Sequence, residues 1–315
     1  MQKTVIAIDL GGTKCAGALI NSKGVILESL KYKLDSREGD DVANLINDLC
    51  LELSDKANDK ALQIDGIGIS IPGISYHGTG CVWAPNIPGW SEYPLQKFIK
   101  KKYPKKIPVL IDSDRACCIL GESWLGIAKG CKHAIFLAVG TGIGAGILID
   151  GRILRGANDI AGAIGWMALE TEYIEEYKKY GCFEYHASGD GLTRIAKHWK
   201  NKAYTILEMK NLSTELIFKA YKQHDPLARL VLDQAIRCWG KASANLISLF
   251  NPEMIIFGGG VFGPGEILID SIKLEASKWA QPISMKKVIM VKSSLGTNAP
   301  LIGAAKLIIE HYANV

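Results

Sequence analysis

An apolar segment that ends in a glycine-rich turn occurs twice in this chain, and the second copy repeats the first 129 positions later. Gly11 of the first copy corresponds to Gly140 of the second, and residues 18–21 (ALIN) correspond to residues 147–150 (ILID). Each copy predicts a strand, a glycine-rich turn, a second strand, a polar turn and a third strand. A duplicated meander of this kind indicates a molecule of two lobes with its ligand between the matching loops.

The rest of the chain alternates strand-like and helix-like runs, which is typical of α/β proteins. A long helix is predicted to begin at Pro226, behind a capping Asp225. Residues 75–94, rich in glycine, proline and aromatic residues, predict a loop that covers other structure instead of a core element. The domains that we expect comprise residues 1–115, joined by the C-terminal helix 301–315, and residues 116–300.

Composition and charge exclude several classes of protein. Hydrophobic residues make up 48% and charged residues 22% of the chain, which is typical of a packed core and not of a disordered chain. Glycines interrupt the most apolar stretch, LAVGTGIGAGILI, well below the roughly 18 apolar residues of a membrane span. The net charge of +5 owes much to a lysine run over residues 97–106, which predicts a solvated helix face. We therefore expect neither a membrane span nor a nucleic-acid partner.

The cysteines favour a reducing compartment. Eight cysteines are scattered through the chain, Cys117 and Cys118 are adjacent, and no C-x-x-C occurs. This pattern is neither a disulfide framework nor a metal-binding motif. The apolar run Val5–Leu10 predicts a buried first strand and not a signal peptide. We expect the protein in the cytoplasm.

Three glycine-rich turns directly follow predicted strands, at residues 11–14, 140–142 and 258–260. Glycine lets backbone N–H groups approach phosphate oxygens, and Thr13 and Thr141 add hydroxyl donors. A tight hairpin explains any one turn equally well, but three together indicate a nucleotide. No P-loop motif occurs in the chain, and no dinucleotide fingerprint G-x-G-x-x-G can be drawn through Gly66, Gly140, Gly142 or Gly144. The phosphates would therefore be held in another way.

Seven motifs, in this order, resemble those of the ROK family of sugar kinases and repressors, which has the actin-like ATPase fold. They are IAIDLGGTK, PNIPGW, IDSDRACCILGE, LAVGTGIGAGILIDGRILRGANDIAGAIGWM, GCFEYHASG, NPEMIIFGGGV and APLIGAA. Together they cover nearly the whole chain. The resemblance implies a two-domain α/β fold with a cleft between the lobes.

The resemblance also implies ATP and magnesium as cofactors. The nucleotide-binding residues that it implies are Asp9, Gly11, Gly12, Thr13 and Lys14 beside the phosphates and magnesium, Gly140, Thr141 and Gly142 on the opposite lobe, and Gly258 and Gly259 beside the nucleoside. The catalytic aspartate of the family falls on Asp114, which would accept the proton of the attacking sugar hydroxyl. Asp114 also fits a helix N-cap at a strand-to-helix junction.

Part of the family's sugar site is replaced in this chain. The substrate-binding residues that the resemblance implies are Gly73, Asn86, Ser113, Asp114, Trp166 and Glu184. Ser113 stands where the family typically has asparagine, and Ala163 and Trp166 stand where it has glutamate and histidine. Each lost charged hydrogen bond is worth roughly 1.5 to 3 kcal/mol. Trp166 is either a stacking platform for a sugar ring or an ordinary core residue.

The zinc site of the family is also changed. Three of its four ligand positions here carry Trp166, Glu175 and Tyr177, so no zinc is expected. We expect Trp166, Tyr177 and Tyr180 to pack as an apolar replacement for the metal. An improvised site around Cys182 and His186 is the weaker alternative.

The resemblance therefore predicts ATP-dependent phosphorylation of a hexose or hexose derivative, by a homodimer. The alternative is a catalytically weak or inactive sugar-binding or nucleotide-binding sensor or regulator, which the replaced sugar ligands favour. A DNA-binding repressor is disfavoured, because the first strand is predicted from about Val5 and leaves no room for a helix-turn-helix before it.

Overall fold

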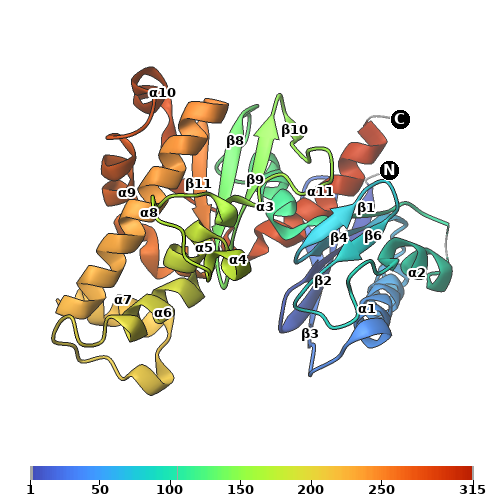
Figure 1. The fold of residues 1–315 in the computed structure, drawn as a ribbon. Coiled ribbons are helices and arrows are strands. Elements are labelled where there is room, and N and C mark those ends of the chain that lie inside the picture. The colour runs from blue at the N-terminus through green and yellow to red at the C-terminus, as the bar shows by residue number, and fades with distance from the viewer. Residues whose placement is uncertain (1–2, 105, 314–315) are drawn as a thin grey trace. The chain divides into compact units, whose positions relative to one another are not determined.

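The computed structural model describes residues 3–104 and 106–313, and the chain forms two compact units (Figure 1). Unit 1 contains the chain up to Gly130, the segment Arg155–Ala161 and the chain from Thr297 onward, and unit 2 contains Cys131–Leu154 and Gly162–Gly296. Within the described ranges, no helix is both long and apolar enough to cross a membrane.

Unit 1 is built on a five-stranded sheet in the order β3-β2-β1-β4-β7. Its strands are β1 (Thr4–Leu10), β2 (Lys14–Asn21), β3 (Ile26–Lys33), β4 (Ile64–Ile71) and β7 (Val109–Ser113). The first three are antiparallel, whereas β4 and β7 run parallel to β1. The helices of the unit are α1 (Gly39–Asp59), α2 (Leu95–Lys102), α3 (Asp114–Trp124) and α11 (Ala299–Ala313). Lys100, Lys101 and Lys102 of α2 are exposed, as the lysine run predicts.

Unit 2 repeats this sheet, in the order β10-β9-β8-β11-β12. Its strands are β8 (Ala134–Val139), β9 (Ile143–Ile149), β10 (Arg152–Ile153), β11 (Met254–Gly258) and β12 (Ile289–Lys292). Again three antiparallel strands precede two strands parallel to the first. The duplicated meander predicted from the repeat is therefore confirmed.

Helices fill most of the remaining chain of unit 2. They are α4 (Tyr177–Tyr180), α5 (Cys182–Ala187), α6 (Gly189–His198), α7 (Thr214–Lys222), α8 (Pro226–Phe250), α9 (Ile269–Ala276) and α10 (Pro282–Lys287). The prediction for α8 is confirmed: Pro226 is its first residue, and the Asp225 carboxylate accepts a hydrogen bond from the Ala228 N–H at 2.8 Å. Trp239 of α8 is fully buried.

The segment 75–94 is not the covering loop that its composition predicts. It contains strand β6 (Cys81–Trp83), which pairs with β5 (Ile74–Tyr76) as an antiparallel hairpin. Trp90 is only 1% exposed, and its indole N–H donates to the Gly39 carbonyl at 3.0 Å. Trp90 therefore serves as core, because burying its large ring outweighs the turn-forming tendency of the neighbouring glycines and prolines.

The unit boundary also lies later than expected, after Gly130 instead of residue 115. The reason is that α3 packs tightly against α11, with Gly303 of α11 so close to the Cys117 carbonyl that a side chain there would overlap with it. Helix α3 therefore belongs to unit 1 and not to the expected second domain, 116–300. The segment Arg155–Ala161, which falls within the expected second domain, also belongs to unit 1.

Candidate active site

Unit 1 gathers carboxylates at one edge of its sheet. The register places Asp9 of β1 beside Ser70 of β4, and Ser70 beside Asp112 of β7. These three residues lie at the carboxyl ends of parallel neighbours, where ligands of open α/β sheets bind. Asp114 follows β7 directly, as the first residue of α3. Two of the predicted site residues, Asp9 and Asp114, are thus brought to the same sheet edge.

The Asp9 carboxyl group is half-buried and has an unusual affinity for protons. The Ser70 hydroxyl donates to Asp9 Oδ1 at 3.0 Å. Burial raises the pKa of Asp9 from 3.8 to about 6; the Ser70 hydrogen bond and the charge of Lys14 lower it, and the charge of Asp114 raises it further. Asp114 is therefore close enough to Asp9 for its charge to disfavour ionisation of Asp9.

Asp114 is not the N-cap of α3. That position belongs to Ser113, whose hydroxyl accepts a hydrogen bond from the Ala116 N–H at 3.3 Å. The backbone of Ser113 is extended, so the helix begins one residue after it. Asp114 Oδ1 instead accepts from the N–H of Arg115 at 2.7 Å, and burial raises the pKa of Asp114. Because Ser113 provides the cap, the Asp114 carboxylate keeps its second oxygen for other partners.

The turn between β1 and β2 is open to ligands. The Gly11 N–H donates to the Lys14 carbonyl at 2.9 Å, which closes the turn. Gly12, Thr13 and Lys14 are all exposed, and no atom lies within 4 Å of the position that a side chain at Gly12 would take. The first predicted phosphate loop therefore has both the donors and the space that a phosphate needs.

Two further predicted residues lie elsewhere in unit 1. Gly73 has a φ of +113°, and a side chain there would overlap with the Trp83 carbonyl. This conformation alone requires glycine at the position. Asn86 is exposed in the turn that leads to the buried Trp90, so its side chain is accessible to a small molecule.

Unit 2 joins its glycine turn to Glu184. The Gly140 N–H donates to the Gly142 carbonyl at 2.9 Å, and Glu184 Oε2 accepts from the Ile143 N–H at 2.7 Å. A side chain at Gly142 would lie 2.7 Å from the same carboxylate oxygen, so glycine is needed for this approach. Thr141, between the two glycines, is exposed. Burial raises the pKa of Glu184. The predicted phosphate turn and the predicted sugar carboxylate thus form one hydrogen-bonded group.

The third glycine turn adjoins the second. Gly259 has a φ of +85°, and a side chain there would overlap with the carbonyl of Val139, the residue before Gly140. Gly258 is buried, and a side chain there would overlap with the ring of Phe136. Close packing therefore explains glycine at 258, whereas Gly259 is exposed and accessible to a nucleoside.

Trp166 is exposed, and its interpretation as a core residue is wrong. It closes the short 3-10 helix Ile164–Trp166, directly after Ala163, and 59% of its surface is accessible. A pocket of about 400 Å³ begins at its ring and extends past Tyr173 and Tyr177. An exposed indole beside a pocket is suited to stack on a sugar ring.

Of the three aromatic residues expected to pack together in place of a metal, Tyr177 is the one that packs against His186. The Tyr177 ring packs edge-on against His186, with ring centres 5.5 Å apart, and its hydroxyl lies 2.6 Å from His186 Nε2. Tyr180 instead faces the Arg194 guanidinium at 4.2 Å, and Trp166 is exposed. Across residues 3–104 and 106–313, no group of three histidine, cysteine or acidic side chains is arranged to hold a metal ion.

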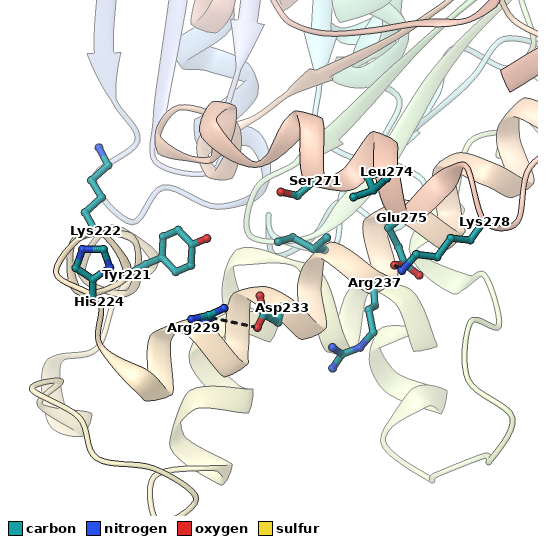
Figure 2. A pocket seen from close by; sticks show the side chains of 11 residues that line it. Tyr221, Lys222, His224, Arg229, Asp233, Arg237, Ser271, Leu274, Glu275 and Lys278 are labelled. Carbon is teal, nitrogen blue, oxygen red and sulfur yellow. Dashed lines mark hydrogen bonds and ion pairs between the residues drawn. The ribbon is translucent and has the colours of Figure 1, made fainter. Parts of the chain in front are cut away.

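Another pocket lies away from these residues, in unit 2. It has a volume of about 660 Å³ and lies between α8 and α9 (Figure 2). Its charged side chains pair with one another: Arg229 lies 3.9 Å from Asp233, and Lys278 lies 2.5 Å from Glu275. It contains no predicted site residue and no glycine turn, so its size does not make it the active site.

The sequence analysis missed one polar cluster in unit 1. His77, Asp112, Arg155 and Asp159 are linked by hydrogen bonds and ion pairs. They come from three segments far apart in the chain, so no spacing signal connects them. Only the fold brings them together.

Comparison with known proteins identifies the family. The model of the ROK family matches residues 5–311. The chain belongs to the ROK family. It is 30% identical to a glucokinase of Thermotoga maritima, in an alignment of 315 positions that covers 97% of this chain and 97% of that one. It is also 29% identical to a xylose repressor of Caldicellulosiruptor bescii, covering 98% of this chain and 78% of the repressor.

The solved structures agree with the family assignment. A ROK family glucokinase from Streptomyces griseus, in complex with glucose and AMPPNP, superposes with a TM-score of 0.78 at 27% identity, covering 96% of this chain and 98% of that one. The prediction of a two-domain actin-like ATPase fold is confirmed. The ROK family therefore supplies relatives of two kinds for this chain, kinases and repressors.

Proposed function

We propose that this ROK protein transfers the γ-phosphoryl group of ATP to a hydroxyl of a hexose or hexose derivative, with Asp114 as general base. The observation that carries the proposal is the pairing of Asp9 and Asp114 at one sheet edge, both with a raised pKa. Groups with shifted pKa values gather at functional sites. The exposed turn 11–14 beside them supports a phosphate-binding role.

Asp114 would take the proton of the acceptor hydroxyl as that oxygen attacks the γ-phosphorus and the bond to the ADP oxygen breaks. Its raised pKa suits this task, because a base works best when its proton affinity is near the working pH. The backbone N–H of Gly12, in the exposed part of the turn 11–14, would help to hold the phosphates while the charge moves.

Magnesium fits the residues present. Asp9, Asp114 and the Ser70 hydroxyl are hard oxygen donors of the kind that this ion prefers. Burial and, to a smaller extent, the charge of Asp114 raise the pKa of Asp9, and a bound cation would offset both effects. When bound, magnesium neutralises part of the phosphate charge in the transition state. Asp9 would hold the ion directly or through water.

Acceptor recognition would rest on fewer charged groups than is typical of the family. Glu184 and Asn86 remain, whereas Ala163 offers no hydrogen bond and Trp166 offers a ring face. A hexose that binds mainly by stacking loses polar selectivity. We therefore propose an acceptor whose apolar ring face matters more than the pattern of its hydroxyl groups.

A regulator is the second candidate, supported by the xylose repressor relative and by the replaced sugar ligands. An assay of ATP consumption over hexoses, hexosamines, N-acetylhexosamines and pentoses separates the two functions. Turnover stimulated by one of these sugars supports the kinase. A sugar that binds in calorimetry without stimulating turnover supports the regulator. A homodimeric state, a cytoplasmic location and the lack of zinc stay predictions from the sequence.

A further inference from the structure

The polar cluster of unit 1 joins three segments of the chain. His77 follows β5, Asp112 lies in β7, and Arg155 and Asp159 lie in the segment 155–161. Arg155 Nη2 donates to Asp112 Oδ2 at 2.5 Å, and Arg155 Nε donates to His77 Nε2 at 3.0 Å. His77 therefore has its ring proton on Nδ1, which lies 3.0 Å from Asp159 Oδ1. The His77 backbone N–H also donates to Asp159, at 3.1 Å.

Asp112 depends on these partners because it is buried, with only 5% of its side chain exposed. Burial alone would raise its pKa, but the neighbouring His77 ring and the Arg155 guanidinium outweigh burial and hold the pKa below its usual value. A buried carboxylate without a partner is strongly destabilising. Arg155 is therefore the counter-charge that Asp112 requires.

The cluster is also continuous with the proposed base. Asp112 Oδ1 accepts from the Ser113 N–H at 2.8 Å, and Ser113 caps the helix that begins with Asp114. The orientation of Asp112 thus fixes the backbone on which the base is placed. On the other side of the cluster, the chain leaves the segment 155–161 and reaches Ala163 and Trp166 within five residues.

We propose that Arg155 is a positioning residue of the phosphoryl transfer, acting through Asp112 on the β7–α3 junction and supported by His77 and Asp159. This inference rests on the proposed kinase function. Arg155 is proposed to act without contacting either the nucleotide or the acceptor. Its effect is to hold the Asp114 carboxylate at the attack geometry, where a displacement of about 1 Å is enough to lower the rate about 100-fold.

The test is steady-state kinetics with ATP and the best acceptor found in the sugar assay. Wild-type turnover is measured first, and its absence would overturn the proposed function together with this inference. We expect Arg155→Ala to lower kcat about 10-fold to 100-fold, with the KM for ATP within about twofold of wild type. Arg155→Lys keeps the positive charge but lacks the planar guanidinium that donates to Asp112 and His77 together, so its kcat should lie between those of Arg155→Ala and the wild type. The control is Arg152→Ala, since Arg152 is exposed in β10.

A purely structural role predicts a different pattern. Asp112→Asn/Arg155→Gln removes the buried charge and its counter-charge together, so it should fold even where Arg155→Ala does not. We expect this double variant to melt near the wild-type temperature yet to keep the low kcat. A double variant with kcat within twofold of wild type would show that Arg155 only balances charge, and would overturn the proposal.

Discussion

Asp9 and Asp114 carry the proposed chemistry at the residue scale, and their surroundings push both toward the protonated form. For Asp9 the main cause is burial, with the charge of Asp114 adding to it and the Ser70 hydroxyl opposing it. Both groups act as carboxylates in the proposed reaction, one toward magnesium and one toward the acceptor proton. Their protonation therefore sets the acid limit of activity.

We expect kcat/KM to fall as the pH drops through about 6, where Asp9 takes up its proton. Ser70→Ala removes the hydrogen bond that stabilises the Asp9 carboxylate, so the acid limb should move to higher pH. The measurement is a pH–rate profile from pH 4.5 to 9. Ser75→Ala is the matched control, because the buried Ser75 hydroxyl donates to the Ile111 carbonyl and not to Asp9. If the acid limb of Ser70→Ala lay at the same pH as that of the wild type, the role given to Asp9 would be contradicted.

The same environment makes the ionised Asp9 unfavourable for folding. The pKa of Asp9 is about 6 in the folded protein, against an ordinary value of 3.8, so the folded state binds the proton more tightly than the unfolded state. The folded protein therefore loses stability as the pH rises through about 6 and Asp9 ionises. Asp9→Asn should therefore stabilise the protein at pH 7.5 by about 1 to 3 kcal/mol while abolishing turnover. Thermal melts at pH 7.5 and pH 4 check this, because the gain should shrink at pH 4. A variant that melts lower than wild type at pH 7.5 would contradict it.

At the scale of elements, glycines set how closely α11 packs in unit 1. Gly303 of α11 lies against the Cys117 carbonyl of α3, and Gly68 of β4 lies against the Ala304 carbonyl of α11. Each side chain introduced at these points would overlap with backbone, which cannot move aside easily. Through this contact α11 supports α3, and α3 begins with the proposed base. Sequence alone suggested an apolar C-terminal helix but gave no reason to place it against α3.

We expect Gly303→Ala to destabilise unit 1 by about 2 kcal/mol or more, because it forces α11 away from α3. Chemical denaturation measures the change. Gly78→Ala serves as the control, since Gly78 has no neighbour within 4 Å of the added carbon, and it should leave the free energy of unfolding within about 0.5 kcal/mol of wild type. Equal effects of the two substitutions would contradict the packing account.

At the scale of the whole molecule, the repeat and the motifs of the sequence were enough to predict the fold class and the duplicated meander. The offset between Gly11 and Gly140 predicted a three-stranded meander in each half of the chain, and both meanders are present. It failed where distant segments meet: nothing in the spacing of His77, Asp112 and Arg155 indicates a shared cluster. It also misjudged Trp90, because composition cannot show that a ring in a glycine-rich and proline-rich stretch finds a buried site.

The sequence also predicts the zinc content of the whole chain. Tyr177, which the resemblance places at a zinc-ligand position of the family, lies within hydrogen-bond distance of His186, so the fold should not depend on a metal there. We expect elemental analysis to find zinc well below one atom per chain. Incubation with EDTA should leave the melting temperature unchanged. Stoichiometric zinc, or a fall in melting temperature with EDTA, would contradict this replacement.

The central claim, that Asp114 is the base of a sugar kinase, is tested most directly by Asp114→Asn. The variant keeps the size of the side chain and the oxygen that accepts from the Arg115 N–H, but it has no carboxylate to take a proton. The measurement is the rate of ADP formation with saturating ATP and acceptor, alongside the dissociation constant of ATP. We predict a rate about 100-fold to 10,000-fold below wild type, with ATP affinity within about threefold. A rate equal to that of the wild type would contradict the claim.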